Sequence, residues 1–362
     1  MSSAVAARKR AAFHVLKVDK LDRITDDAVA ITFEVPPELA HEFTYTPGQH
    51  VAVRATIAGD DVRRNYSICA PADSGVLRIG VKRLPGGVFS GYALERLQEG
   101  DSLEVMSPTG SFTATIDPDQ ARHYGAVAAG SGITPILSIL STALATEPKS
   151  QATLVFVNAT TQSIMFLEEL EDLKNRYLDR FEVFYVLDAE RQESEVLSGR
   201  LDEERFTAIL DGSQSDSVDD WFLCGPLPMT DMVREVLLGR GVADAHIHRE
   251  LFHTSATPPP PPPSGSDAGE GYKITVLLDG RTTEFQLKPG TVPILDAARV
   301  VRSDIPYACK NGVCGTCRCK ITSGTVDMVQ NYALEPYEVD EGFVLSCQAY
   351  PTSDKVVADF DQ

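Results

Sequence analysis

The sequence is poor in basic residues and has no long uninterrupted hydrophobic run. Its 33 lysine and arginine residues are outnumbered by 52 aspartate and glutamate residues, which gives a formal charge of −19. Nucleic acids and anionic membranes require a basic footprint, so we expect neither as a main partner. No run reaches the roughly 18 apolar residues of a membrane-spanning helix, and no apolar secretory segment follows the N-terminal basic residues. These features predict a cytoplasmic protein.

Cysteine is scarce outside the C-terminal part of the chain. Of the seven cysteines, most lie between residues 309 and 347, whereas a secreted disulfide scaffold would be short and would spread its cysteines evenly. The 362 residues correspond to about two or three domains, and 43% hydrophobic with 23% charged residues is typical of globular proteins. In a reducing compartment the cysteine cluster therefore predicts metal binding.

The most distinct domain boundary is a run of prolines at 258–263, followed by Gly and Ser residues. Consecutive prolines form a stiff polyproline II rod, so we expect a tether over 255–271, with an SH3 or WW ligand as the weaker alternative. Short alternating strands predict an antiparallel β-barrel over 11–118. Strands alternating with helices predict an α/β domain with a parallel sheet over 119–254. Residues 272–362 form the third expected domain.

The expected strands of the barrel are 30–35, 49–55, 64–69, 76–82 and 102–106, and those of the α/β domain are 124–129, 154–158, 181–187 and 221–224, with helices over 135–144, 164–177 and 228–238. In the third domain we expect a hairpin of 273–278 with 282–287 and a helix over 292–300.

Four cysteines of the third domain have the spacing of a plant-type [2Fe–2S] ferredoxin. Cys309, Cys314 and Cys317 form C-x4-C-x2-C, and Cys347 follows after a long gap. The glycines between them allow a loop to wrap closely around a cluster. A structural zinc site is the alternative, but zinc sites favour paired short spacings. Cys319 falls outside the pattern and is expected to be a packed residue.

A second motif, Arg64-Asn65-Tyr66-Ser67 with Gly80-Val81-Lys82-Arg83 and Gly86-Gly87-Val88-Phe89-Ser90, resembles the flavin site of the ferredoxin–NADP reductase superfamily. The resemblance implies bound FAD. It implies that Arg64 pairs with the pyrophosphate, that Tyr66 packs on the isoalloxazine and that Ser67 bonds near N5. It adds contacts from Val81, Lys82, Gly87, Val88 and Ser90, the last three at a helix N-terminus. A strand-edge arginine beside a core tyrosine is the ordinary alternative.

Two further turns match the same superfamily. Gly130-Ser131-Gly132-Ile133-Thr134-Pro135 differs from the G-x-G-x-x-G fingerprint but matches the superfamily's G-x-G-[IL]-[TA]-P turn. Here Gly130 and Gly132 permit close approach of a nucleotide, Thr134 can bond a phosphate, and Pro135 is expected to start a helix. Cys224-Gly225-Pro226 resembles the turn whose cysteine lies near the nicotinamide. The resemblance places Ser67 and Cys224 at the reacting rings; a simple tight turn and a buried thiol are the alternatives.

The choice of nicotinamide coenzyme stays open, as NADPH or NADH. Relatives often place an arginine after the asparagine that ends the second strand, but Ala159 follows Asn158 here. Hydroxyl groups at Thr160, Thr161 and Ser163 could still bind a 2′-phosphate. Glu250 and Phe252 fall where family members place a residue over the flavin face; for Phe252, a core position is the equal alternative.

The order of barrel, nucleotide domain and C-terminal ferredoxin with a β-grasp fold resembles the reductase components of multicomponent oxygenases. Segments 331–336, 342–348 and 351–357 are especially similar to the reductases of phenylacetyl-CoA epoxidases of phenylacetate degradation. The resemblance implies electron transfer from NAD(P)H through FAD and a [2Fe–2S] cluster to an oxygenase component, most simply the di-iron phenylacetyl-CoA epoxidase subunits. A reductase of a steroid hydroxylase or Rieske oxygenase, a stand-alone diaphorase and a metal-stabilised docking module remain alternatives. We interpret His246, His248 and His253 as ordinary strand or surface residues.

Overall fold

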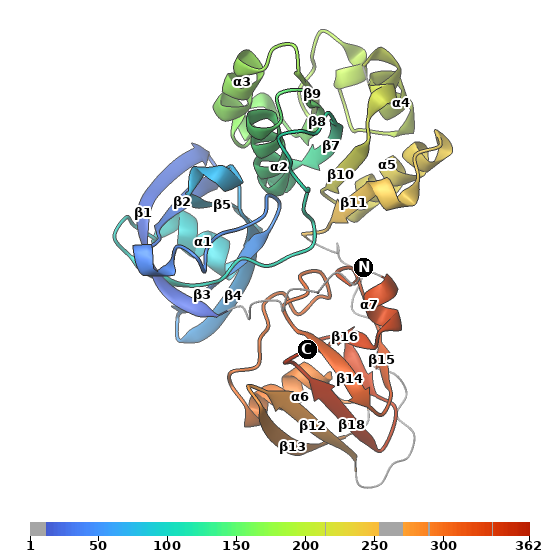
Figure 1. Ribbon diagram of the computed structural model, residues 1–362. Coiled ribbons are helices and arrows are strands. Elements are labelled where there is room, and N and C mark those ends of the chain that lie inside the picture. Colours follow the sequence, from blue (N-terminus) through green and yellow to red (C-terminus); the bar gives the residue numbers. More distant parts are fainter. Residues whose placement is uncertain (1–11, 214, 253–270, 289, 335) are drawn as a thin grey trace. The chain divides into compact units, whose positions relative to one another are not determined.

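The computed structural model describes residues 12–213, 215–252, 271–288, 290–334 and 336–362 (Figure 1). The chain divides into two compact units, residues 1–250 and 251–362. Residues 255–270 of the expected tether and His253 lie outside the described residues. No helix within the described ranges is long and apolar enough to cross a membrane.

The first unit begins with the expected barrel. Its strands β1 (Phe13–Thr25), β2 (Ala28–Glu34), β3 (His50–Ile57), β4 (Asp60–Ser67), β5 (Leu77–Lys82) and β6 (Ser102–Met106) form one antiparallel sheet in the order β4-β3-β6-β1-β2-β5. A backbone bridge between Ile68 and Ile79 joins the two edges of this sheet, and α1 (Val88–Glu95) follows β5. Closure of the sheet protects the edge strands from pairing with another chain.

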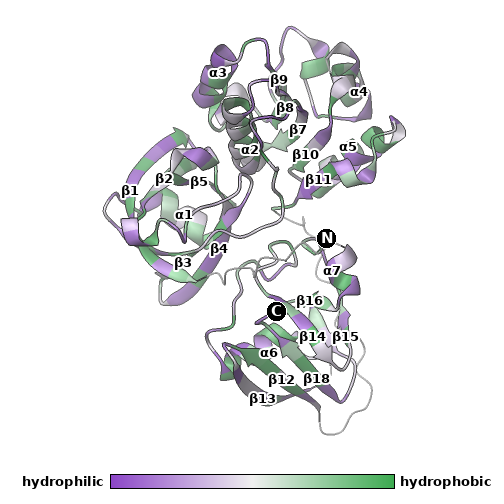
Figure 2. Cartoon of the chain, viewed as in Figure 1, coloured by the Kyte–Doolittle hydropathy of each residue, from purple (hydrophilic) through white to green (hydrophobic). Residues whose placement is uncertain are grey.

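Strand β1 is absent from the expected strands, although it is the longest in the barrel. Only Leu16 and Val18 of its central residues are fully buried, because charged residues alternate with them and point outward. Figure 2 shows this alternation along β1. The charged residues make the segment too polar to be recognised as a strand in the sequence. The alternation of buried and exposed residues is nevertheless typical of a half-buried strand.

The expected parallel sheet forms the rest of the first unit. Its order is β11-β10-β7-β8-β9, and its strands are β7 (His123–Ala129), β8 (Gln151–Asn158), β9 (Phe181–Leu187), β10 (Asp220–Cys224) and β11 (Ile247–Glu250). Helices α2 (Ile133–Thr146), α3 (Leu167–Arg176), α4 (Glu203–Gly212) and α5 (Leu227–Gly239) connect them. The residues of β8 and β10 are almost all buried, as in strands covered on both faces.

The sequence patterns do not reveal α4 or β11, and they place the start of α2 too late. Helix α2 begins at Ile133, so Pro135 lies within its first turn and does not start it. A proline is tolerated there because the first N–H groups of a helix have no partner within the helix.

The second unit has the α+β ferredoxin architecture. It contains a five-stranded sheet of order β13-β12-β18-β14-β16 and a small sheet of β15 and β17. These sheets share one hydrophobic core with a helix. The elements are β12 (Tyr272–Leu278), β13 (Arg281–Leu287), α6 (Ile294–Val301), β14 (Arg318–Ser323), β15 (Val326–Met328), α7 (Pro336–Asp340), β16 (Phe343–Leu345), β17 (Ala349–Pro351) and β18 (Lys355–Asp359). The hairpin turns at Asp279 and Gly280, both with positive φ, which is the geometry that Asp-Gly favours.

Candidate active site and cluster site

The flavin-type motif lies at the end of β4, where it meets α1. The ring of Tyr66 packs against Phe89 of α1 with 5.4 Å between ring centroids. Burial raises the pKa of the Tyr66 phenol well above its ordinary value, so the side chain stays neutral. Arg64 is exposed, and its guanidinium donates to the backbone oxygen of Arg63 at 2.7 Å. An arginine so placed keeps most of its donors available for an anion.

The glycine turn before α1 forms the expected helix N-terminus. Gly87 caps the helix, and Val88 is its first residue. The Ser90 hydroxyl accepts from the Leu84 N–H at 3.1 Å and donates to the Gly87 oxygen at 3.2 Å. The hydroxyl of Ser90 therefore fixes the turn, and the backbone N–H groups of the first helical turn are the donors that face outward for a phosphate.

Val81 and Lys82 of β5 have different environments. Val81 is fully buried in the barrel core. The Lys82 ammonium donates to the Ser163 oxygen at 3.4 Å and lies 3.5 Å from Asp27. Lys82 thus links the barrel to the loop that follows β8.

The two nucleotide-type turns are in direct contact. A Cβ at Gly132 would lie 2.1 Å from the backbone oxygen of Cys224, so only glycine fits there. The Thr134 side chain is 1% exposed, and its hydroxyl donates to the Ser131 oxygen at 3.0 Å. Thr134 therefore holds the turn in shape, and its hydroxyl does not face outward. A Cβ at Gly225 would lie 2.6 Å from the Met229 side chain, and Pro226 caps α5.

Four polar side chains from distant segments meet where the barrel approaches the parallel sheet. The Ser67 hydroxyl donates to Glu250 Oε2 at 3.0 Å, and His50 Nδ1 lies 3.8 Å from Glu250 Oε1. Cys224 is paired in register with Glu250 on the neighbouring strand. Burial, with a smaller contribution from the Glu250 carboxylate, raises the pKa of the Cys224 thiol well above its ordinary value. The structure thus brings the expected pair Ser67 and Cys224 to one carboxylate.

His50 is absent from the candidate residues, although it belongs to this group. Burial lowers its pKa to about 4, so the imidazole is neutral near pH 7. The available signal is a histidine directly after Pro47-Gly48-Gln49, at the start of a strand whose next three residues are apolar. Phe252 is half-buried and lies beyond residue 250, where the first unit ends.

The four candidate ligand cysteines lie in the loop before β14 and directly after β16. Their thiols interact in two pairs: Cys309 with Cys314, and Cys317 with Cys347. Hydrogen bonding from Cys309 lowers the pKa of Cys314 to about 6, and hydrogen bonding from Cys317 lowers the pKa of Cys347. The two pairs also interact with each other, so the four thiols lie close enough together to ligate one cluster. In the described part of the chain, no group of three or more His, Cys, Asp or Glu side chains is arranged around a single metal-ion position.

The backbone of this loop has the geometry that a cluster needs. Gly312 and Gly315 have φ of +74° and +65°, which lets the loop curve tightly. The Asn311 N–H donates to the Cys309 sulfur at 3.4 Å. Donors to sulfur stabilise the negative charge of ligating thiolates and tune a cluster's potential. Cys319 is fully buried in the core of the second unit, as expected for a packed residue.

Three protein families match the chain in the order of its domains. The oxidoreductase FAD-binding domain matches residues 15–114, the oxidoreductase NAD-binding domain 126–235, and the 2Fe-2S iron-sulfur cluster binding domain 276–352. The chain is 43% identical over 352 residues to one subunit of the 1,2-phenylacetyl-CoA epoxidase of Escherichia coli K12, covering 96% of this chain and 98% of the relative. It belongs to the family of FAD- and [2Fe–2S]-containing reductase components of oxygenases.

Other relatives of this reductase serve different oxygenases. It is 32% identical to the ferredoxin reductase component of the 3-ketosteroid-9-alpha-monooxygenase of Rhodococcus rhodochrous, with 96% of each chain covered. The solved structure of phthalate dioxygenase reductase has the same fold, with a TM-score of 0.59 and 24% identity over 96% of this chain and 98% of that one. The three-domain electron-transfer architecture is therefore established, with FAD, a nicotinamide nucleotide and a [2Fe–2S] cluster as cofactors.

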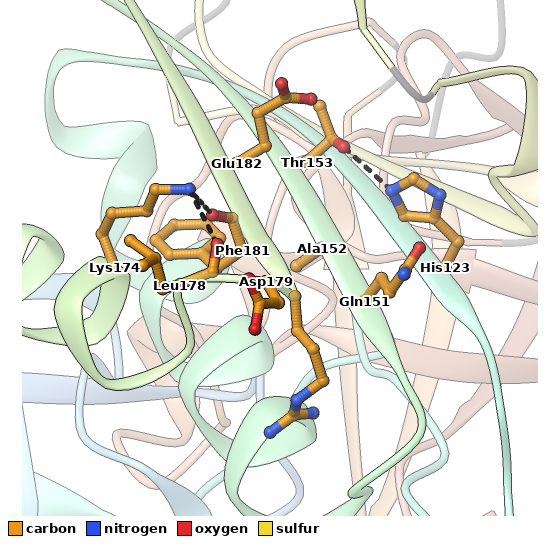
Figure 3. A pocket seen from close by; sticks show the side chains of 10 residues that line it. His123, Gln151, Ala152, Thr153, Lys174, Leu178, Asp179, Phe181 and Glu182 are labelled. Carbon is orange, nitrogen blue, oxygen red and sulfur yellow. Dashed lines mark hydrogen bonds between the residues drawn. The ribbon is translucent and has the colours of Figure 1, made fainter.

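The reductase also has a pocket of about 280 Å³ at the other end of its parallel sheet. Figure 3 shows its lining, with His123 hydrogen-bonded to Thr153 and Lys174 bonded to the backbone oxygen of Phe181. His123, Gln151 and Phe181 are the first residues of β7, β8 and β9. Because open α/β sheets bind nucleotides at the carboxyl ends of their strands, this pocket is not the coenzyme site.

Two of the three histidines that cluster in the sequence near residue 250, His246 and His248, contact the same carboxylate. His246 Nδ1 and His248 Nε2 lie 2.9 and 3.4 Å from Asp220 Oδ1, and the His248 ring stacks on Phe222. Hydrogen bonding, first from His248, lowers the pKa of the Asp220 carboxyl despite its burial. Both imidazole rings therefore have structural contacts at the edge of the parallel sheet, as expected for ordinary strand or surface residues.

Proposed function

We propose that this reductase supplies electrons from NAD(P)H to the di-iron oxygenase subunits of a phenylacetyl-CoA epoxidase. The observation that carries the proposal is the 43% identity to a phenylacetyl-CoA epoxidase component along almost the whole of both chains, against 32% to a ketosteroid monooxygenase reductase. The aligned 352 residues include most of the ferredoxin part.

The proposed roles of the flavin residues follow from their positions. Arg64 and the N–H groups of the turn at Gly87, Val88 and Ser90 would bind the FAD pyrophosphate. Tyr66, held by Phe89, would lie against the isoalloxazine. Lys82 would contribute to the wall of the site and Phe252 would cover a flavin face, whereas Val81, fully buried in the barrel core, would only support the wall from behind. When bound, FAD accepts two electrons together and releases them singly.

The nicotinamide end would be assembled by Ser67, Cys224 and Glu250. Glu250 orients the Ser67 hydroxyl from 3.0 Å, and the neutral Cys224 thiol, which is fully buried, would support the wall of the nicotinamide site from beneath. The turn Gly130–Gly132 and Thr134 would bind the coenzyme phosphates through backbone N–H groups, Pro135, which has no N–H, would fix the first turn of the helix, and Gly225-Pro226 would complete the wall. Cys309, Cys314, Cys317 and Cys347 would hold the cluster. We retain 11–118, 119–254 and 272–362 as the proposed domain boundaries, joined by 255–271.

The test is a reconstitution with purified phenylacetyl-CoA epoxidase oxygenase subunits. We expect NAD(P)H consumption that depends on phenylacetyl-CoA and is matched by epoxide formation. The control replaces them with the oxygenase of a ketosteroid monooxygenase and its steroid substrate. Coupled turnover with the steroid oxygenase alone would overturn the epoxidase assignment and favour the second relative's reaction.

A further inference from the structure

The pocket at the amino ends of β7, β8 and β9 is lined by side chains outside the proposed flavin, coenzyme and cluster sites (Figure 3). Its volume of about 280 Å³ lies near the lower end of the range for small-molecule sites. Its walls come from the first residues of these strands, from Lys174 near the end of α3 and from the turn that leads to β9. The Gly130–Gly132 turn lies at the opposite end of β7.

The Arg180 guanidinium lines the pocket but is engaged by the backbone. It donates to the oxygens of Leu144, Glu147 and Ser150, each at 2.9 Å. Its central carbon also lies 4.7 Å from the centroid of the Tyr177 ring. These bonds satisfy carbonyl groups at the end of α2 and in the turn after it, so Arg180 has a structural role.

His123 and Thr153 form a hydrogen-bonded row along another wall. His123 Nε2 lies 2.8 Å from the Thr153 hydroxyl, and Nδ1 lies 2.7 Å from the Ser217 hydroxyl. Burial lowers the pKa of His123 below its ordinary value, so the ring is neutral near pH 7. The row therefore contributes polar groups that already have partners, and no charge.

Lys174 is a half-buried cation that no carboxylate balances. Its ammonium donates to the backbone oxygen of Leu178 at 3.3 Å and to that of Phe181. It forms no ion pair with a carboxylate in the part of the chain that the structure describes. An ammonium has three hydrogens, so two backbone bonds leave one hydrogen for a further acceptor, and an anionic acceptor would bind most strongly.

Glu182 supplies the opposite charge. It is half-buried on β9 beside Thr153 of β8, and its Oε2 is buried with no hydrogen-bond partner among the described residues. No described cation pairs with this carboxylate, Lys174 included. A carboxylate that is partly removed from water and unpaired is costly, so a positive group in the pocket would be stabilised there. Two opposite charges that do not pair with each other favour a ligand that carries both.

We propose that this pocket binds a small zwitterion with an ammonium group, a carboxylate and a short apolar chain, such as an apolar α-amino acid. Lys174 donates to its carboxylate, Glu182 stabilises its ammonium, and Leu178, which is 64% exposed, packs against its apolar chain. Gln151 and Asp179 line the same pocket without side-chain partners among the described residues and add polar contacts. The inference goes beyond the proposed function and does not depend on it.

Calorimetry on the full chain, with its flavin and cluster bound, tests the site with three related probes. L-leucine carries both charges, isopentylamine lacks the carboxylate, and isocaproate lacks the ammonium. We expect L-leucine to bind with a Kd on the order of 1 mM, as suits so small a ligand. Each of the other two should bind about 10- to 100-fold more weakly, because each loses one charge-assisted contact. Addition of 5′-AMP should not displace L-leucine, since the Gly130–Gly132 turn lies at the other end of the sheet.

The variants assign the binding to the two charges. In Glu182→Gln the advantage of L-leucine over isocaproate should be lost, and in Lys174→Met its advantage over isopentylamine should be lost. Glu168→Gln and Lys149→Met are the matched controls, because both residues are exposed and lie outside the lining, and they should leave binding unchanged. Circular dichroism checks the fold of each variant. If Lys174→Met does not fold, Glu182→Gln still decides the result.

Three results would overturn the inference. The first is no binding of L-leucine at roughly 20 mM, well above the expected Kd. The second is displacement of L-leucine by 5′-AMP, which would place the amino acid at the coenzyme turn. The third is unchanged L-leucine binding in folded Glu182→Gln protein. None of these results bears on the proposed function, which NAD(P)H-dependent epoxide formation tests separately.

Discussion

At the scale of single residues, the reacting site depends on one carboxylate that several other groups surround. Glu250 accepts the Ser67 hydrogen bond, lies beside His50 and is paired in register with Cys224. Burial keeps the thiol and the imidazole neutral. The group therefore positions the Ser67 hydroxyl on the Glu250 carboxyl in a largely dry environment.

Replacing Ser67 or Glu250 should slow flavin reduction without removing the flavin. For Ser67→Ala and Glu250→Gln we expect reduction by NAD(P)H to slow by roughly 100- to 1,000-fold, because an oriented polar group at a reacting centre contributes about that much. Stopped-flow absorbance near the flavin maximum measures the rate. Ser107→Ala removes another buried hydroxyl of the barrel and should leave the rate unchanged. Unaltered rates in both site variants would remove the pair from the reaction.

Buried His50 should make the stability of the protein depend on pH. Its pKa of about 4 in the folded state lies below the ordinary 6.5, so the unfolded chain binds the proton more readily between these values. Glu250 at 3.8 Å is too far for a hydrogen bond, which leaves burial as the dominant cause. No stability is lost above pH 6.5, and up to about 3 kcal/mol is lost on acidification from pH 6.5 to pH 4.

Denaturant unfolding of the native chain and of His50→Gln across this pH range measures that loss. As the pH falls, the unfolding free energy of the native chain should decrease more than that of His50→Gln. A difference that stays constant from pH 7 to pH 4 would show that His50 is not buried in its neutral form.

At the scale of elements, the site depends on close contact between two turns. The turn before α2 touches the end of β10 at Gly132, and a barrel strand touches α2 at Gly80, where a Cβ would lie 2.8 Å from the Thr134 side chain. A larger side chain at either glycine would displace the backbone, because adding even one methyl group to a packed interior lowers the stability of the protein.

Gly132→Ala should therefore damage both stability and coenzyme binding. The new Cβ would lie 2.1 Å from the Cys224 oxygen, so the turns must separate, at a cost of about 1–3 kcal/mol. Gly212→Ala is the control, because nothing lies within 4 Å of its Cβ in α4. Chemical denaturation and 5′-AMP titration read the two effects. Equal behaviour of the two variants would contradict the close contact.

The sequence predicts elements whose signal is local and misses those that depend on distant partners. The turns around Gly87, Gly132 and Cys309 carry their own signatures, and the apolar strands of the parallel sheet are evident from composition. The strands after Cys317 are short and pair with segments far along the chain, so no local pattern defines them. His50 is missed for the same reason, because its neighbour Glu250 is distant in the sequence and comes near only when the barrel packs against the parallel sheet.

At the scale of the whole molecule, the two compact units have separate cores. The core of the second unit consists of residues from Tyr272 onward, and the barrel and the parallel sheet have their own clusters. A unit with its own core can fold by itself. Damage to the cluster site should therefore remain in the second unit.

Cys314→Ala should remove the [2Fe–2S] signal and electron transfer to the oxygenase, while reduction of the flavin by the coenzyme continues. Visible absorption and electron paramagnetic resonance measure the cluster, and ferricyanide reduction reports on the flavin. Cys319→Ala is the control, since Cys319 is buried outside the ligand pairs and should keep the cluster. Loss of flavin reduction in folded Cys314→Ala protein would contradict the order from coenzyme through flavin to cluster.

The hydrogen bond between Ser67 and Glu250 also has a consequence during synthesis. The two residues are 183 positions apart, and at a bacterial or eukaryotic ribosome's rate the second leaves roughly 10 to 40 s after the first. For that interval a nascent barrel lacks the carboxylate of the reacting group. The reacting group can therefore form only after the last strand of the parallel sheet has been made.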